Sequence, residues 1–137
     1  MNIVQVNKSE IKDALLSCRA NRQVAARSIV FLAVAPKSEA GVLVFDDWSD
    51  RSLGYVLEIN VLPDFREQGV GSALLAHTEV FARSLNCSML ELKAYSLDLK
   101  QNSNSSLIEW YQRRGYRLTG GEKGSMEKCL TRASEDG

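Results

Sequence analysis

Several residue types that mark large classes of protein are scarce in this 137-residue sequence. It has only two prolines and one histidine, and its 17 basic residues are balanced by 17 acidic ones. A net charge of zero gives no general attraction for a nucleic acid or an anionic membrane. No run of Lys and Arg supplies a local attraction either, so we expect neither partner.

Cysteine is also scarce, and its spacing excludes two kinds of site. Cys18, Cys87 and Cys129 are far apart, with no Cys-x-x-Cys pair and no histidine cluster nearby. This pattern fits neither a metal site nor a disulfide framework, so we expect no metal and reduced, mostly buried thiols. The longest apolar runs, such as residues 29–35, are too short to cross a bilayer, and the N-terminus lacks a signal-peptide core. We therefore expect a cytoplasmic protein.

The sequence does contain enough apolar residues for a core. Hydrophobic residues make up 45% of the chain and charged residues 25%. These values exclude disorder for most of the chain, and its length fits one domain. We expect that domain to span residues 1–137, with residues 133–137 as a disordered tail.

Periodicity predicts alternating strands and helices. Alternating or β-branched runs predict strands at residues 3–6, 28–35, 41–45, 53–62, 87–95, 116–119 and 125–131. Helical spacing predicts three helices. The first starts after Ser9, which serves as its N-cap, and the others span residues 70–85 and 105–114. Residues 46–52 and 97–103 are expected to be polar loops. This order describes a mixed sheet with helices packed on its faces.

The segment from Arg66 to Gly71 lies between a predicted strand and the strongest predicted helix. The first N–H groups of a helix are unpaired and carry the positive end of its dipole, so they can bind a pyrophosphate. Gly69 and Gly71 have no Cβ atoms, which lets a ligand approach the main chain, and Ser72 adds a hydroxyl. The alternative is an ordinary strand-to-helix turn. The segment lacks the Gly-Lys-Ser/Thr of a Walker loop and the third glycine of a dinucleotide site.

Two segments resemble motifs of one enzyme family. Residues 61–71, VLPDFREQGVG, resemble motif A of the GNAT superfamily of acyl-CoA-dependent N-acetyltransferases. Residues 104–116, NSSLIEWYQRRGY, resemble its motif B, although Leu107 replaces the usual alanine and residues 96–103 make a longer connection. The predicted element order agrees with that family over nearly the whole chain.

The resemblance implies a fold, a co-substrate and a reaction. The fold is α/β (α+β), with a mixed, mostly antiparallel sheet and helices on both faces. The reaction is direct attack of a primary amine, from a small molecule, peptide or protein, on acetyl-CoA. In the family, pantetheine lies between two splayed strands, here residues 53–62 and 87–95. The implied CoA contacts are Ile59, Val61, Leu62, Arg66, Gln68, Gly69, Val70, Gly71, Ser72 and Asn104.

The resemblance also implies catalytic residues, each with a plainer alternative. Tyr111 stands where the family has a donor to the CoA sulfur; a core aromatic residue is the alternative. Glu91 is the first candidate for the base and Glu58 the second, each acting directly or through water, although both could be solvated or ion-paired strand carboxylates. Asn104 could cap the next helix, the reading we favour, or contact the cofactor. We expect His77 to be a packed residue.

Two other functions remain open at this stage. One is a catalytically silent CoA-binding sensor or subunit, and the other is an interaction domain in which the glycine turn is only geometry. Binding of CoA without turnover would indicate the first, and no binding would indicate the second. The sequence leaves the acceptor, the acyl chain length and the oligomeric state open, and a homodimer is among the forms it allows.

Overall fold

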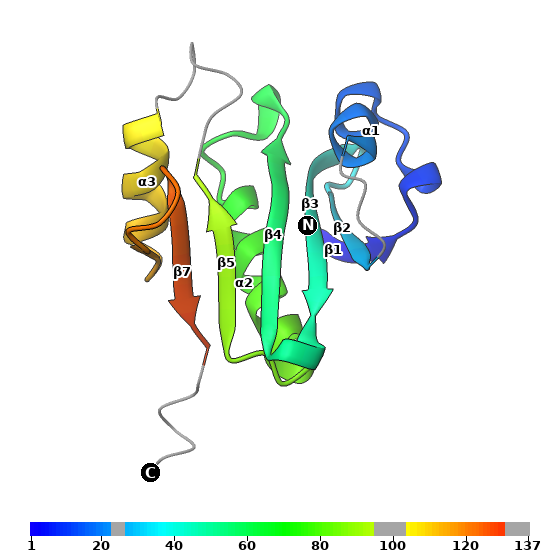
Figure 1. The fold of residues 1–137 in the computed structure, drawn as a ribbon. Helices are drawn as coiled ribbons and strands as arrows, with labels where there is room; N and C mark the ends of the chain where they lie inside the picture. Colours follow the sequence, from blue (N-terminus) through cyan, green and yellow to red (C-terminus); the bar gives the residue numbers. More distant parts are fainter. Residues whose placement is uncertain (23–26, 95–103, 131–137) are drawn as a thin grey trace.

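The computed structural model describes residues 1–22, 27–94 and 104–130 (Figure 1). The strands are β1 (Asn2–Val6), β2 (Ser28–Val34), β3 (Glu39–Trp48), β4 (Leu53–Val61), β5 (Met89–Lys93), β6 (Arg117–Leu118) and β7 (Ser125–Cys129). The α-helices are α1 (Ala14–Asn21), α2 (Val70–Ser84) and α3 (Asn104–Gln112), and short 3-10 turns occur at Lys8–Glu10, Ser49–Arg51 and Pro63–Phe65. The predicted tail at residues 133–137 lies outside the described residues.

The strands form one sheet in the order β1-β2-β3-β4-β5-β7-β6. Every neighbouring pair is antiparallel except β4 and β5, which are parallel. The long connection between these two strands contains α2, as a parallel crossover requires. The predicted fold class, a mixed and mostly antiparallel sheet with helices on both faces, is confirmed.

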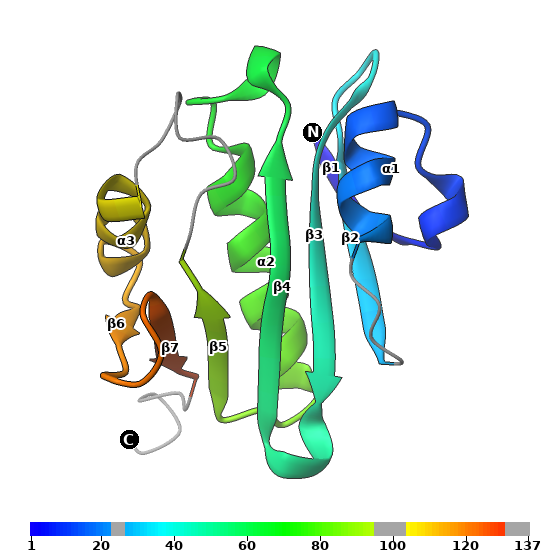
Figure 2. The same ribbon diagram turned by 45° about the horizontal axis from the view of Figure 1, so that its top comes forward.

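The central strands are apolar on both faces because both faces are covered. Phe31, Leu43 and Phe45 belong to the core beneath α2, whereas their strand neighbours Val42 and Val44 belong to a second core shared with α1. Successive residues of a strand point to opposite faces, which produces this division. Helices α2 and α3 pack on the first face and α1 on the other (Figure 2).

The prediction for the first helix start was wrong. Asn7 precedes a single 3-10 turn and forms a capping box with Glu10, while Ser9 lies inside that turn. The α-helix begins later, where the Asp13 carboxylate accepts the N–H groups of Leu15 and Leu16, each at 3.0 Å. The negative charge of Asp13 is also stabilised by the positive end of the helix dipole, so Asp13 is a better N-cap for α1 than the neutral Ser9.

Other expectations need smaller corrections. Residues 46–48, expected in a polar loop, extend β3 because they pair with residues 53–55 of β4. Of the three thiols, only Cys87 is buried; Cys18 and Cys129 are exposed, and the three described cysteines form no disulfide with one another. The packed role of His77 is confirmed, since its ring meets the ring of Phe31 edge-on at 4.7 Å between centroids. The part of the chain that the structure describes contains no helix long and apolar enough to span a membrane, and no group of candidate metal ligands.

Candidate functional site

Strands β4 and β5 are paired along only part of their length. Their parallel pairing runs from Leu53 with Met89 to Val56 with Leu92. Beyond Val56, β4 continues to Val61 and is paired only with β3. A bulge at Leu57 marks the change, because Glu58 pairs with Val44 and Val56 with Phe45. The second half of β4 therefore presents a strand edge toward the side of β5 (Figure 1).

The hydrogen bonds to β3 show which main-chain groups lie on that edge. The N–H of Leu62 donates to the carbonyl of Ala40 at 2.9 Å, so the main-chain groups of Leu62 face β3. The Leu62 carbonyl also accepts the N–H of Phe65 at 2.9 Å. Main-chain groups of successive residues in a strand point to opposite edges, so those of Val61, and of Ile59 two residues before it, face the side of β5. The main chain of Leu62 is therefore already engaged by the fold, and the expected contact of this residue with CoA stays a prediction.

The turn between β4 and α2 holds itself together with its own side chains. The Arg66 Nε donates to the carbonyl of Val61 at 3.1 Å, and the Gln68 Nε2 donates to the carbonyl of Asp64 at 2.9 Å. Gly69 is the N-cap with a φ of 81°, and open space surrounds the position that its Cβ would occupy. A glycine takes this left-handed conformation without steric cost.

Helix α2 begins with N–H groups that have no partner within the helix. Its first internal bond is from the N–H of Ala73 to the carbonyl of Gly69, at 2.9 Å. The N–H groups of Val70, Gly71 and Ser72 therefore lie at the open, positive end of the helix. A Cβ on Gly71 would make an ordinary contact with the Trp110 ring of α3, at 3.4 Å, so the packing of α3 against α2 does not itself require a glycine here.

Arg114 is a residue of this region that the sequence analysis missed. Its Nε and Nη2 donate to the Ser72 Oγ at 3.0 and 2.6 Å, and its guanidinium stacks on the Trp110 ring at 3.7 Å. Ser72 and Arg114 are far apart in the sequence, and only the packing of α3 against α2 brings them together. The one signal in the sequence is the position of Arg114 beside Gly115, at the end of the second motif.

Tyr111 lies in the core beneath the sheet, with only 3% of its surface exposed. Its ring contacts the rings of Trp110 and Tyr116 at 5.0 and 5.7 Å between centroids. Its hydroxyl makes no hydrogen bond to any residue that the structure describes. Burial and then the negative charge of Glu58 raise the pKa of the Tyr111 phenol above its usual range, so the phenol stays protonated at neutral pH.

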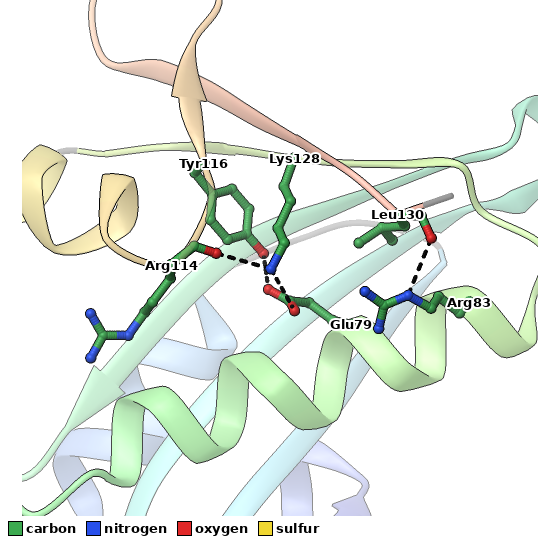
Figure 3. A network of polar contacts seen from close by, with 6 residues as sticks. All are labelled: Glu79, Arg83, Arg114, Tyr116, Lys128 and Leu130. Atoms are coloured by element: carbon green, nitrogen blue, oxygen red, sulfur yellow. Dashed lines mark hydrogen bonds and ion pairs between the residues drawn. The ribbon is translucent and has the colours of Figure 1, made fainter. Parts of the chain in front are cut away.

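Tyr116, by contrast, belongs to a buried polar network (Figure 3). Its hydroxyl donates to the Glu79 Oε2 at 2.7 Å. The Lys128 Nζ donates to the Glu79 Oε1 at 3.0 Å and to the carbonyl of Arg114 at 2.9 Å. Together these contacts connect α2, the turn after α3, and β7. They hold α3, and with it Tyr111, at a fixed depth beneath the sheet.

The two candidate bases occupy different parts of the sheet. Glu58 follows the bulge in β4, in the half that β5 does not pair, and its charge acts on Tyr111. Glu91 lies in the paired half, between Tyr55 of β4 and Glu127 of β7, and its charge acts on Tyr55. Glu58 therefore lies in the unpaired half of β4 and is near enough for its charge to act on Tyr111, although it pairs with Val44 of the α1 face whereas Tyr111 packs on the α2 face. Glu91 lies in the paired half.

Asn104 is the first residue of α3. Its side chain and the connection at residues 96–103 lie outside what the structure describes, so its capping role and the effect of the long connection stay predictions.

Comparison with known proteins gives a consistent result. A family model for the acetyltransferase (GNAT) domain matches residues 26–118. An acetyltransferase of the GNAT family from Staphylococcus aureus is 15% identical, with a TM-score of 0.70 over 95% of this chain and 99% of that one. The ribosomal-protein-S18-alanine N-acetyltransferase from Escherichia coli is 17% identical, with a TM-score of 0.69 over 98% and 97%.

A third solved structure contains coenzyme A. It is the PaiA N-acetyltransferase from Thermoplasma acidophilum, which is 17% identical, with a TM-score of 0.62 over 84% of this chain and 67% of that one. Comparison with curated protein sequences found no match. At these identities the solved structures support the fold, and the family model covers more than half of the sequence. This chain therefore belongs to the GNAT acetyltransferase family.

Proposed function

We propose that this protein transfers an acetyl group from acetyl-CoA to a primary amine of a small molecule, peptide or protein. The observation that carries the proposal is the meeting of three features at one place. The free edge of β4 and the Glu58 carboxylate belong to the half of β4 that β5 leaves unpaired, and the charge of Glu58 acts on the Tyr111 phenol of α3. This is the arrangement that a thioester donor with a peptide-like arm needs.

The edge of β4 fits the pantetheine arm of CoA. Ile59 and Val61 present main-chain groups toward the side of β5; the Val61 carbonyl already accepts the Arg66 Nε, which leaves the Val61 N–H and both main-chain groups of Ile59 for a partner. Pantetheine contains two amide groups and can pair with such an edge as an added strand does. The pyrophosphate then falls at the N–H groups of Val70, Gly71 and Ser72, where open space beside Gly69 leaves room for it.

The chemistry follows from the charges beside this edge. The amine nitrogen attacks the thioester carbonyl carbon, so that a C–N bond forms and the C–S bond breaks. Glu58 accepts the ammonium proton, directly or through water. The negative charge that develops on sulfur is stabilised by a hydrogen bond from the Tyr111 hydroxyl. Because the pKa of Tyr111 is raised, the phenol keeps its proton while it donates this bond, and the thiolate takes its proton from water.

We assign the base to Glu58 in preference to Glu91. Glu58 is close enough to Tyr111 for its charge to act on the phenol, whereas Glu91 lies in the paired half of the sheet. A base and a leaving-group donor must both reach the same thioester, so the pair near each other is the better assignment.

The test combines binding and turnover in the wild-type protein. Calorimetry should show heat on titration with acetyl-CoA, and acetyl-CoA should raise the melting temperature more than NAD or ATP does. A panel of primary amines should then include one that releases free thiol from acetyl-CoA. Binding with no thiol release from any amine would favour the silent CoA-binding module. The absence of binding at high micromolar acetyl-CoA would contradict the proposal.

A further inference from the structure

Arg114 extends from the end of α3 toward the N-terminal end of α2. Figure 3 shows its guanidinium lying away from the Glu79 network, although its carbonyl is held there by Lys128. The guanidinium is fixed by its two bonds to the Ser72 Oγ, by an Nη1 bond of 2.9 Å to the carbonyl of Trp110, and by stacking on that ring. The cation is therefore held rigidly beside the first turn of α2.

This cation has no carboxylate partner among the residues that the structure describes. Its hydrogen bonds go to a hydroxyl and a carbonyl, which leave its positive charge uncompensated; burial and then the neighbouring cation of Arg113 lower the pKa of Arg114. Arg114 is also partly buried, in contrast to the exposed Arg113. A partly desolvated charge without a counter-ion is costly, so the folded protein gains free energy when an anion binds beside it.

The donors that remain on Arg114 and Ser72 suit a phosphate group. A guanidinium has five N–H groups, and three take part in the bonds described above. The Ser72 Oγ accepts both of its bonds from Arg114, so its own O–H proton is still available for donation. Arginine is the side chain best matched to a phosphate, because its planar N–H groups bind two oxygens at once.

We propose that Arg114 is a phosphate-binding residue of this enzyme and contacts the pyrophosphate of CoA at the start of α2. The proposal rests on the proposed function, since it assumes that CoA binds there. In this role the Arg114 guanidinium compensates the negative charge of the ligand. Its bonds to Ser72 also join the two sequence motifs into one site.

Calorimetry with three ligands tests this role. The ligands are CoA, dephospho-CoA, which keeps the pyrophosphate, and pantetheine, which has no phosphate. Arg114→Gln should weaken binding of CoA and dephospho-CoA about 10- to 100-fold, as expected for a lost charged hydrogen bond, and should leave pantetheine affinity unchanged. The matched control is Arg113→Gln, which removes the neighbouring exposed cation and should change all three affinities less than about 3-fold.

A second variant separates binding from packing. Arg114→Lys keeps the charge and should recover part of the CoA affinity, while a purely structural role would show equal loss for all three ligands, pantetheine included. Unchanged CoA affinity in a folded Arg114→Gln protein would overturn the proposal, as would a loss seen with CoA but not with dephospho-CoA. If the wild-type protein bound no CoA at all, the proposed function itself would fail, which is a distinguishable result.

Discussion

Tyr111 and Tyr116 belong to the same segment, are both buried, and contact each other through their rings at 5.7 Å. Their hydroxyl groups differ. The Tyr116 hydroxyl donates to the buried Glu79, whereas the Tyr111 hydroxyl makes no hydrogen bond to any residue that the structure describes. A hydroxyl that the fold does not use for its own hydrogen bonds stays available to a ligand. The comparison separates a tyrosine whose hydroxyl stabilises the fold from one whose hydroxyl is available for the proposed role in catalysis.

The largest expected effect comes from removing the hydroxyl of Tyr111. Tyr111→Phe should lower kcat roughly 10- to 1000-fold, because its bond to sulfur strengthens as charge develops in the transition state. The melting temperature and the dissociation constant of acetyl-CoA should stay nearly unchanged. Steady-state kinetics with saturating acetyl-CoA and an amine acceptor measure this.

Tyr116→Phe is the matched control for that experiment. It should keep kcat within about 3-fold in the folded protein, but lower the stability by about 1–3 kcal/mol because the Glu79 carboxylate loses a donor. A fully active Tyr111→Phe enzyme would erase the distinction between the two tyrosines.

The next effect concerns the two candidate bases, Glu58 and Glu91. Glu58→Gln should lower kcat about 10- to 100-fold while leaving acetyl-CoA affinity intact, because the amide cannot accept the ammonium proton. Glu91→Gln, on the same sheet, should have the smaller effect. The measurement is kcat for both variants across a pH series. A larger loss for Glu91→Gln than for Glu58→Gln would assign the base to Glu91 instead.

Glu79 should act on stability instead of on the chemical step. Glu79→Gln leaves the charge of Lys128 without its partner in a site where both side chains are largely buried, at 24% and 11% exposed. We expect a loss of about 1–3 kcal/mol in the free energy of unfolding by urea. Glu122→Gln breaks an exposed pair with Lys93 and should cost less than about 1 kcal/mol. Equal losses of unfolding free energy in the two variants would contradict a larger contribution of the buried network to stability.

The smallest effect is a pH dependence of stability in alkaline solution. Burial raises the pKa of both tyrosines, and the charge of Glu79 and that of Glu58 raise those of Tyr116 and Tyr111 further. Above pH 10 the unfolded chain releases these protons while the folded protein keeps them, so the stability present below pH 10 falls as the pH rises. The slope is up to about 1.4 kcal/mol per pH unit for each tyrosine. Urea unfolding between pH 9 and 11 should show that the free energy of unfolding falls less steeply with pH in Tyr116→Phe than in the wild type. An unchanged slope would contradict a raised pKa of Tyr116.

Much of the fold follows from the sequence, because its elements have strong local patterns. The apolar stripe of α2 predicts a helix and the β-branched runs of β2 and β3 predict strands. The two motifs around Gly69 and Tyr111 indicate the region where CoA is proposed to bind. The first helix start was mispredicted because Ser9 and Asp13 are both good caps, and only the tertiary structure selects Asp13.

The site could be predicted less completely, since its arrangement depends on contacts between distant segments. No local pattern reveals that β4 and β5 part after Val56, that Leu62 uses its amide on β3, or that Arg114 reaches Ser72. For the same reason, the choice between Glu58 and Glu91 could not be made from alternation along each strand, which treats both as polar strand positions.

Hydrogen exchange of β4 tests the central claim, that acetyl-CoA pairs with the free half of this strand. Amide protection is measured along β4 in the presence and absence of acetyl-CoA. The amides of Ile59 and Val61 should gain protection when acetyl-CoA binds, because pantetheine covers the edge they face. Those of Gly54 and Val56, in the half already paired with β5, should change little. Binding of acetyl-CoA with no added protection at Ile59 and Val61 would contradict the account.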